Sequence, residues 1–294
     1  MATYQTYQSV GNREDLTDII TNISPMDTWF TSNSGSANAK GTYHEWQTDA
    51  LAAAAANAKI EGAAASDGTI TATSRAGNYT QIMEKCFKIA KTQEAIDKAG
   101  RKSEIAYQTE KHMKELARDL EYALLLNTAA ASGASGTARQ LKGVRGWIAT
   151  NTATAASATV SATETGVNNV LQLIWTEGGS PSNVLCGAVA KKLFSGMATS
   201  QRQYIDANKT VTNTVDVYQS DFGTVAIRLH HIINASAPTQ VMILGDMSLW
   251  AKAWLRGIKR QQEPFAGDAD LFSIRGEITL ESKQEKGSGI LTLG

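Results

Sequence analysis

"SEIAYQTEKHMKELARDLEYALLLN", residues 103–127, decides the fold because it carries the strongest helix pattern in the chain. Apolar side chains recur there on one stripe at helical spacing. They are Met113, Leu116, Ala117, Leu120 and Leu124. Glu110 with Lys114 and Lys111 with Glu115 have the i,i+4 spacing of ion pairs, which add a few tenths of a kcal/mol each. At about 1.5 Å per residue this helix is about 37 Å long, which is long for a domain of a 294-residue chain.

Upstream of this helix, two extended segments flank an alanine-rich tract. The tract is "DALAAAAANAKIEGAAASDG", residues 49–68, in which ten of the sixteen residues 50–65 are alanine. Alanine buries little apolar area, so the tract contributes little to a core. "TYHEWQTD" before it alternates aromatic and polar residues, and "GTITATSRAGNYTQIMEKCFKIAKT" after it is rich in Thr and Ile. We expect a two-stranded ribbon that needs a neighbouring surface, because such a ribbon is marginal alone in water.

The first residues and the C-terminal half complete an α+β pattern. Residues 1–39 read as an arm with a short apolar helical face that ends before Pro25. Downstream, we expect a helix that ends at Gly178-Gly179, the strands "NVLCGAV" and "QVMILGD", and the short helix "AKKLFSGMA". "VDVYQSDFGTVAIRLHHII" predicts a hairpin that turns at residues 220–223. A helix carrying Trp250 and Trp254 and two strand-like runs, "FSIRGEITLES" and "KGSGILTLG", follow.

Composition argues against several classes of protein. The 28 basic and 28 acidic residues leave no net charge, whereas a dedicated DNA-binding protein needs an excess of Lys and Arg. Zero net charge also removes electrostatic opposition to self-association. The first residues have no apolar core typical of a signal peptide, and no run approaches the length of a membrane span. Cys86 and Cys186 are expected to be two buried thiols in a reducing cytoplasm.

Motifs that carry chemistry are missing. The chain has no GxxxxGK[ST], no GxGxxG between a strand and a helix, and no GxSxG elbow. The four histidines lack metal-ligand spacing, and the adjacent His230 and His231 would point to opposite faces of a strand. The six tryptophans are scattered, as core or interface anchors are. We therefore expect no catalytic residue, no cofactor and no metal, and an α/β hydrolase is the weakest alternative.

The order of these features resembles the HK97-type major capsid proteins of tailed bacteriophages. The residues are similar in particular to the family typified by the phage SU10 major capsid protein. The matching stretches run in family order over nearly the whole chain: "EDLTDIITNISPMDTWF", "YHEWQTDALAAAAANAKIEG", "GNYTQIMEKCFKIAKT", "ELARDLEYALLLN", "GVRGWIATN", "WTEGGSPSNVLCGAVAKKLFSGM", "VDVYQSDFGTVAIRLHHII" and "IRGEITLESKQEKGSGIL".

The resemblance implies an α+β fold of the HK97 capsid type. Its parts would be an N-terminal arm over 1–39, the extended E-loop over 40–89, the P-domain over 90–150 with its spine helix at 103–127, an α/β A-domain over 151–258, and C-terminal strands over 259–294 that return to the P-domain. It also implies hexamers and pentamers that build an icosahedral shell around double-stranded DNA, without catalysis.

The same resemblance implies where and with what the chain assembles. We expect a virion protein assembled in the cytoplasm of the bacterial host, possible scaffolding, portal and decoration partners, no sequence-specific DNA binding and no membrane. We expect the short arm to carry no helical scaffolding extension of the kind found in some family members, so that scaffolding would come from a separate protein or be unnecessary. No partner asparagine for a lysine crosslink is identified, so no crosslink is expected. An encapsulin-like nanocompartment shell with the same fold is the main alternative.

Contacts between subunits are expected in extended regions that cannot bury themselves. The candidates are Trp29 and Phe30 in the arm, Tyr43, Trp46, Tyr79 and Ile82 for seating the loop, and Arg75, Lys85 and Lys88 for pairing with acidic residues of a neighbouring spine helix or P-domain. Packing within the same chain is the open alternative for each residue.

Overall fold

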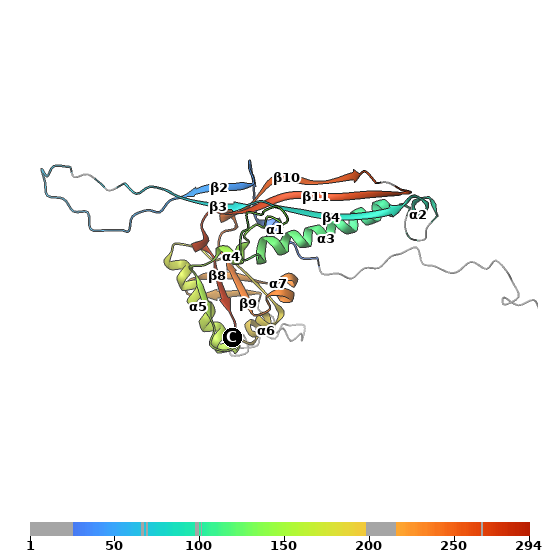
Figure 1. Ribbon diagram of the computed structural model, residues 1–294. Helices are drawn as coiled ribbons and strands as arrows, with labels where there is room; N and C mark the ends of the chain where they lie inside the picture. The colour runs from blue at the N-terminus through green and yellow to red at the C-terminus, as the bar shows by residue number, and fades with distance from the viewer. Residues whose placement is uncertain are drawn as a thin grey trace, which may run out of the picture.

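The described part of the protein has two large β-sheets joined by one long helix, and a separate two-stranded sheet (Figure 1). The computed structural model describes residues 26–65, 68, 70–97, 100, 102–197, 216–265 and 267–294. The expected apolar face of the arm before Pro25 lies outside the described residues. A four-stranded sheet and the helix α3 form an elongated upper part in Figure 1, and a six-stranded sheet with its helices lies below it.

The predicted long helix is α3, Glu104–Leu126. It begins where the Ser103 side chain accepts a hydrogen bond from the backbone N–H of Ala106, a typical N-cap. Leu116, Leu120 and Leu124 of the predicted stripe are buried, but Met113 is 48% exposed. The buried positions concentrate in the C-terminal half of α3, where the helix is covered by the arm and the second part of the molecule as well as by the sheet.

The four-stranded sheet has the order β1-β10-β11-β4. Its strands are β1 Gly35–Asn38, β10 Trp250–Glu263, β11 Ala269–Ser282 and β4 Gln81–Ala90. β1 is parallel to β10, and the other neighbours are antiparallel. One face packs on α3 through a core that includes Met83, Phe87, Phe272 and Ile274.

The segment with Trp250 and Trp254 is a strand, so the predicted helix there is wrong. β10 pairs with β11 from Trp250↔Ser282 to Glu263↔Leu271, and its register shifts twice between Trp254 and Lys259. Such bulges break the period-two alternation that identifies a strand in the sequence. The spacing of the two tryptophans then resembles a helical repeat, while pairing with distant strands decides the structure.

The six-stranded sheet has the order β5-β12-β9-β6-β8-β7. Its strands are β5 Thr152–Thr154, β12 Gly289–Thr292, β9 Gln240–Leu244, β6 Asn183–Cys186, β8 Gly223–Leu229 and β7 Val217–Ser220. Its helices are α5 Val160–Thr176, α6 Ala188–Met197 and α7 His231–Ser236. The predicted hairpin is β7–β8. His230 and His231 lie at the start of α7, not in a strand as expected.

The two sheets divide the chain differently from the expected boundaries. β12 is within the six-stranded sheet, so not all C-terminal strands return to the first sheet. β10 begins at Trp250 and belongs to the first sheet, inside the range 151–258 expected to be the A-domain. β4 likewise belongs to the first sheet, although all of its residues except Ala90 fall within the range 40–89 expected to be the loop. These three strands are placed by pairing over long sequence separations, which local patterns do not reveal.

Short elements connect these parts. They are α1 Trp29–Asn33, α2 Lys91–Ala95, α4 Val144–Trp147, the antiparallel pair β2 Tyr43–Thr48 and β3 Ser74–Tyr79, and 3-10 turns at Met247–Leu249 and Glu285–Gly287.

A buried carboxylate on α3 holds the arm. The Glu121 side chain is fully buried and accepts hydrogen bonds from the backbone N–H of Phe30, at 2.7 Å, and of Thr31, at 2.8 Å. The His230 Nε2 atom, also buried, lies 3.1 Å from Glu121 Oε1. At the other end of α1, Lys252 Nζ donates to the carbonyl oxygens of Thr31 and Ser34. Burial lowers the pKa of Lys252, and the charge of Glu121 opposes that shift.

We expect Glu121→Ala to lower the free energy of unfolding by about 3–5 kcal/mol, because it leaves buried donors unpaired. Chemical denaturation followed by circular dichroism measures the change. Glu110→Ala is the matched control, because Glu110 is on the same helix, is exposed, and pairs with Lys114 in an i,i+4 ion pair at the surface, where such pairs stabilise little. Equal effects of the two substitutions would contradict the role of Glu121.

Candidate subunit interface

A loop projects from one end of the described molecule (Figure 1). β2 and β3 pair from Tyr43↔Tyr79 to Thr48↔Ser74, which gives the two-stranded ribbon expected from the alternation. The described residues of 49–73 between them form no helix or strand. Leu51 is 99%, Ile60 84% and Ile70 95% exposed. Aliphatic side chains with no cover in their own chain make this loop a candidate contact region.

Aromatic side chains anchor the root of the loop. The Trp46 ring lies 5.4 Å from the Trp147 ring of α4, between centroids, and Lys142 Nζ lies 4.6 Å from the centre of the Trp147 ring. Tyr43 and Tyr79 pack with their centroids 4.6 Å apart. Gly77 permits this packing, because a Cβ there would lie 2.6 Å from the Tyr43 ring. Trp46, Tyr43 and Tyr79 therefore hold the ribbon within its own chain, although Tyr43 remains 44% exposed.

The arm candidates also make contacts within their own chain. Phe30 is fully buried and packs edge-on against Trp250, with ring centroids 6.3 Å apart. Phe30 therefore pins the arm to the core of its own subunit, which is the alternative left open for this residue. Trp29 is half-buried, and the Arg228 guanidinium lies 5.2 Å from the centre of its ring.

The basic candidates have partners in the same chain as well. Arg75 Nε lies 3.1 Å from Glu45 Oε1 across the ribbon. Lys85 Nζ lies 2.7 Å from Asp119 Oδ2, so the spine helix supplies an acidic partner, but from the same subunit. Lys88 Nζ lies 4.2 Å from the centre of the Phe265 ring. Ile82 on β4 is 48% exposed and stays available to a neighbour.

Two exposed side chains were missed by sequence reasoning. Trp175, one of the six tryptophans that are scattered as core or interface anchors are, is 61% exposed, and its ring centroid lies 6.2 Å from that of Phe222. Cys86 was expected to be buried, but it is exposed on β4, because alternate residues of this strand face away from α3. Cys186 is buried as expected, and burial raises its pKa to about 12.

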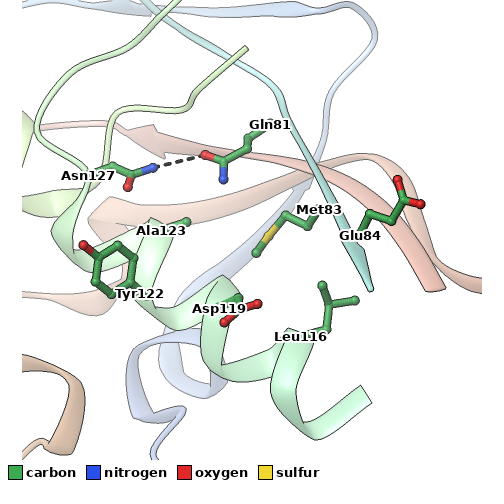
Figure 2. A pocket seen from close by; sticks show the side chains of 8 residues that line it. All are labelled: Gln81, Met83, Glu84, Leu116, Asp119, Tyr122, Ala123 and Asn127. Atoms are coloured by element: carbon green, nitrogen blue, oxygen red, sulfur yellow. Dashed lines mark hydrogen bonds between the residues drawn. The ribbon is translucent and has the colours of Figure 1, made fainter. Parts of the chain in front are cut away.

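An open groove runs between α3 and the edge of β4 (Figure 2). Its volume is about 290 Å³. Met83, Leu116 and Ala123 are its buried apolar lining residues, while Glu84 and Tyr122 are exposed. Asn127 Nδ2 donates to Gln81 Oε1 at 3.1 Å and ties the helix end to the strand. The groove offers an apolar strip beside a strand edge, with no nucleophile–histidine pair along it.

Among the described residues, no three His, Cys, Asp or Glu side chains lie together as metal ligands do. None of the described helices has the length and apolar character needed to cross a membrane.

Comparison with known proteins identifies the family. The model of the SU10 major capsid protein family matches residues 2–293. The major capsid protein of Escherichia phage Phieco32 is 24% identical over 340 residues, covering 98% of this chain and 96% of that protein. Among solved structures, the capsid of a native GTA particle has a TM-score of 0.66 at 12% identity and covers 98% of this chain and 97% of its own. The capsid of Myoviridae phage XM1 has a TM-score of 0.66 at 11% identity, with 96% and 97% covered.

These structural likenesses confirm the expected HK97-like capsid fold. The family match spans both sheets, the long helix and the projecting loop. The chain therefore belongs to the SU10 major capsid protein family.

Proposed function

We propose that this chain is the major capsid protein of a tailed bacteriophage and assembles as hexamers and pentamers into an icosahedral head around double-stranded DNA. The observation that carries the proposal is the family match over residues 2–293. The projecting loop supports it, because Leu51, Ile60 and Ile70 are almost fully exposed in the isolated subunit. Burying these side chains against another copy is worth about 25 cal/mol per Å² of apolar surface.

The shape of the subunit suits a closed, head-to-tail assembly. The loop projects from one end of the elongated upper part, and α2 lies at the opposite end (Figure 1). A protruding surface on one subunit that meets a different surface on the next gives a heterologous contact, which closes into a ring when the rotation allows it. With no net charge, the subunits have no long-range repulsion to overcome.

We assign the parts of the subunit as follows. The ribbon β2–β3 with residues 49–73 is the E-loop, the four-stranded sheet with α3 is the P-domain, and the six-stranded sheet with α5 and α6 is the A-domain that meets its copies around the ring axes. The chain performs no catalysis and contacts DNA without sequence specificity. Assembly takes place in the cytoplasm of the bacterial host, with scaffolding, portal and decoration proteins as candidate partners.

Assembly itself is the first test. We expect the chain produced in bacteria, alone or with a co-encoded scaffolding protein, to give shells, sheets or rings of five and six subunits. Negative-stain microscopy and analytical sedimentation measure this. A chain that stays monomeric at high concentration under both conditions would exclude the proposed function.

Deleting residues 50–65 tests the loop. We expect the deletion to leave the midpoint of thermal unfolding within about 2 °C, because Leu51 and Ile60 pack on nothing in their own chain and surface changes alter stability little. Closed shells should be lost, as counted by electron microscopy.

Trp147→Ala is the contrasting variant, because it removes the ring that holds Trp46 at the loop root. It should lower the unfolding midpoint, since truncating a partly buried tryptophan costs about 3 kcal/mol. If deleting residues 50–65 lowered the unfolding midpoint as much as Trp147→Ala does, the assignment of the loop would be contradicted.

A further inference from the structure

The outer edge of β4 is a long strand edge without a strand partner in the described part of the chain. β4 pairs with β11 from Gln81↔Ile278 to Ala90↔Ala269, and it is the last strand in the order of its sheet. An edge of this length exposes a row of backbone N–H and C=O groups, which proteins normally cover, shorten or protect with inward charges. The groove of Figure 2 lies beside the first part of this edge, at Gln81, Met83 and Glu84.

The side chains of β4 alternate cleanly between its two faces. Met83, Phe87 and Ile89 are buried on the side of α3. On the other face Ile82, Glu84, Cys86, Lys88 and Ala90 are all exposed. Along this exposed face, an acidic residue and a basic residue lie at equal distances on either side of Cys86. This pattern is complementary to itself when the strand is reversed.

We infer that the β4 edges of two copies of this chain pair antiparallel about a two-fold axis at Cys86. A two-fold axis perpendicular to the sheet reverses the direction of the strand but leaves each face on its own side of the sheet. With the axis at Cys86, residue i of one copy lies opposite residue j of the other copy when i + j is 172. Glu84 of each copy then lies opposite Lys88 of the partner subunit, so the contact is made twice. The two copies of Cys86 lie opposite each other. On the other face Met83 lies opposite the partner's Ile89.

The charges select this register over its neighbours. Centring the pair on Glu84, Lys85 or Lys88 would place like charges directly opposite, which destabilises a strand pair. Centring it on Phe87 leaves Glu84 opposite Ala90 and Lys88 opposite Cys86, with no opposite charges matched. Glu84 already accepts a hydrogen bond from Arg275 at 2.9 Å through Oε1, and its second oxygen remains for the lysine across the pair.

This contact deepens the proposed function, on which it rests, because it joins two subunits directly through their P-domain sheets. A two-fold contact is isologous and differs in kind from the head-to-tail contact of the projecting loop. Each subunit would thus carry one surface that builds rings and one self-complementary strand edge that links two subunits across a two-fold axis. The occupant of the edge is a second copy of β4, and the loop of a neighbour is the competing occupant.

Cys86 makes the register directly measurable. Opposite residues of an antiparallel pair have Cα atoms about 4.5–5.5 Å apart, within the range that a disulfide spans. Diamide takes two electrons and two protons from a pair of thiols and leaves the disulfide. We expect diamide treatment of assembled particles to convert most of the chain to a dimer on a non-reducing gel. Cys86→Ser should reduce that dimer to background, because Cys186 is buried.

Two further variants test the register itself. In the Cys86→Ser background, Ile82→Cys and Ala90→Cys chains produced together should form a disulfide-linked heterodimer, since 82 and 90 sum to 172. Either variant alone should give none, because the two copies of residue 82 would lie about 27 Å apart along the strand pair. Both positions are exposed, so neither change removes core packing.

The outcomes separate this inference from the proposed function. Shells that form normally but give no Cys86 dimer, or that crosslink Ile82→Cys to itself, overturn the β4 pairing and leave the capsid function intact. Without shells the proposed function fails, and the same oxidation of concentrated soluble protein still tests the pair. A Cys86 dimer there supports the strand contact, and its absence overturns it.

Discussion

The rest of the structure depends on the hydrogen bonds that the buried Glu121 carboxylate accepts from the arm. Glu121 lies on α3, the helix that contacts both parts of the molecule, where it accepts hydrogen bonds from the arm and lies within hydrogen-bond distance of His230 before α7. A charge taken out of water destabilises a fold unless hydrogen bonds compensate it. The arm, the long helix and the second sheet must therefore meet correctly for any of them to be stable. Lys252 completes the arrangement at the other end of α1, where backbone carbonyls favour a cation.

Because the Glu121 contacts hold the core together, the exposed loop is free to contact other subunits. The core clusters enclose the C-terminal half of α3 and the inner strands, while Leu51, Ile60 and Ile70 of the loop are held by nothing in their own chain. The Trp46 ring packs on the Trp147 ring between the buried core and the exposed loop, and this contact fixes the direction in which the loop projects. A rigid root with an unpacked tip lets one subunit reach another without changing its own fold.

Sequence patterns predicted the elements whose signals are local. The stripe from Leu116 to Leu124 identified α3, and alternation around Trp46 identified the ribbon. The failures share a physical cause, because β10 and β12 are placed by partners distant in sequence and β10 is interrupted by register shifts. For the interface candidates, sequence reasoning chose aromatic and basic residues in extended segments. It had no means of seeing that Phe30 is covered by Trp250, or that Asp119 of the same chain reaches Lys85.

The exposed face of β4 shows why a neutral chain can still assemble selectively. Zero net charge removes general repulsion, but it also gives no preferred orientation to two subunits that meet. Orientation must then come from the order of charges along particular surfaces, because like charges placed opposite each other reject a wrong register. Glu84 and Lys88, set symmetrically about Cys86, supply that order on a strand whose backbone groups would otherwise pair in any register. The strand edge contributes affinity, and its two charges determine the register.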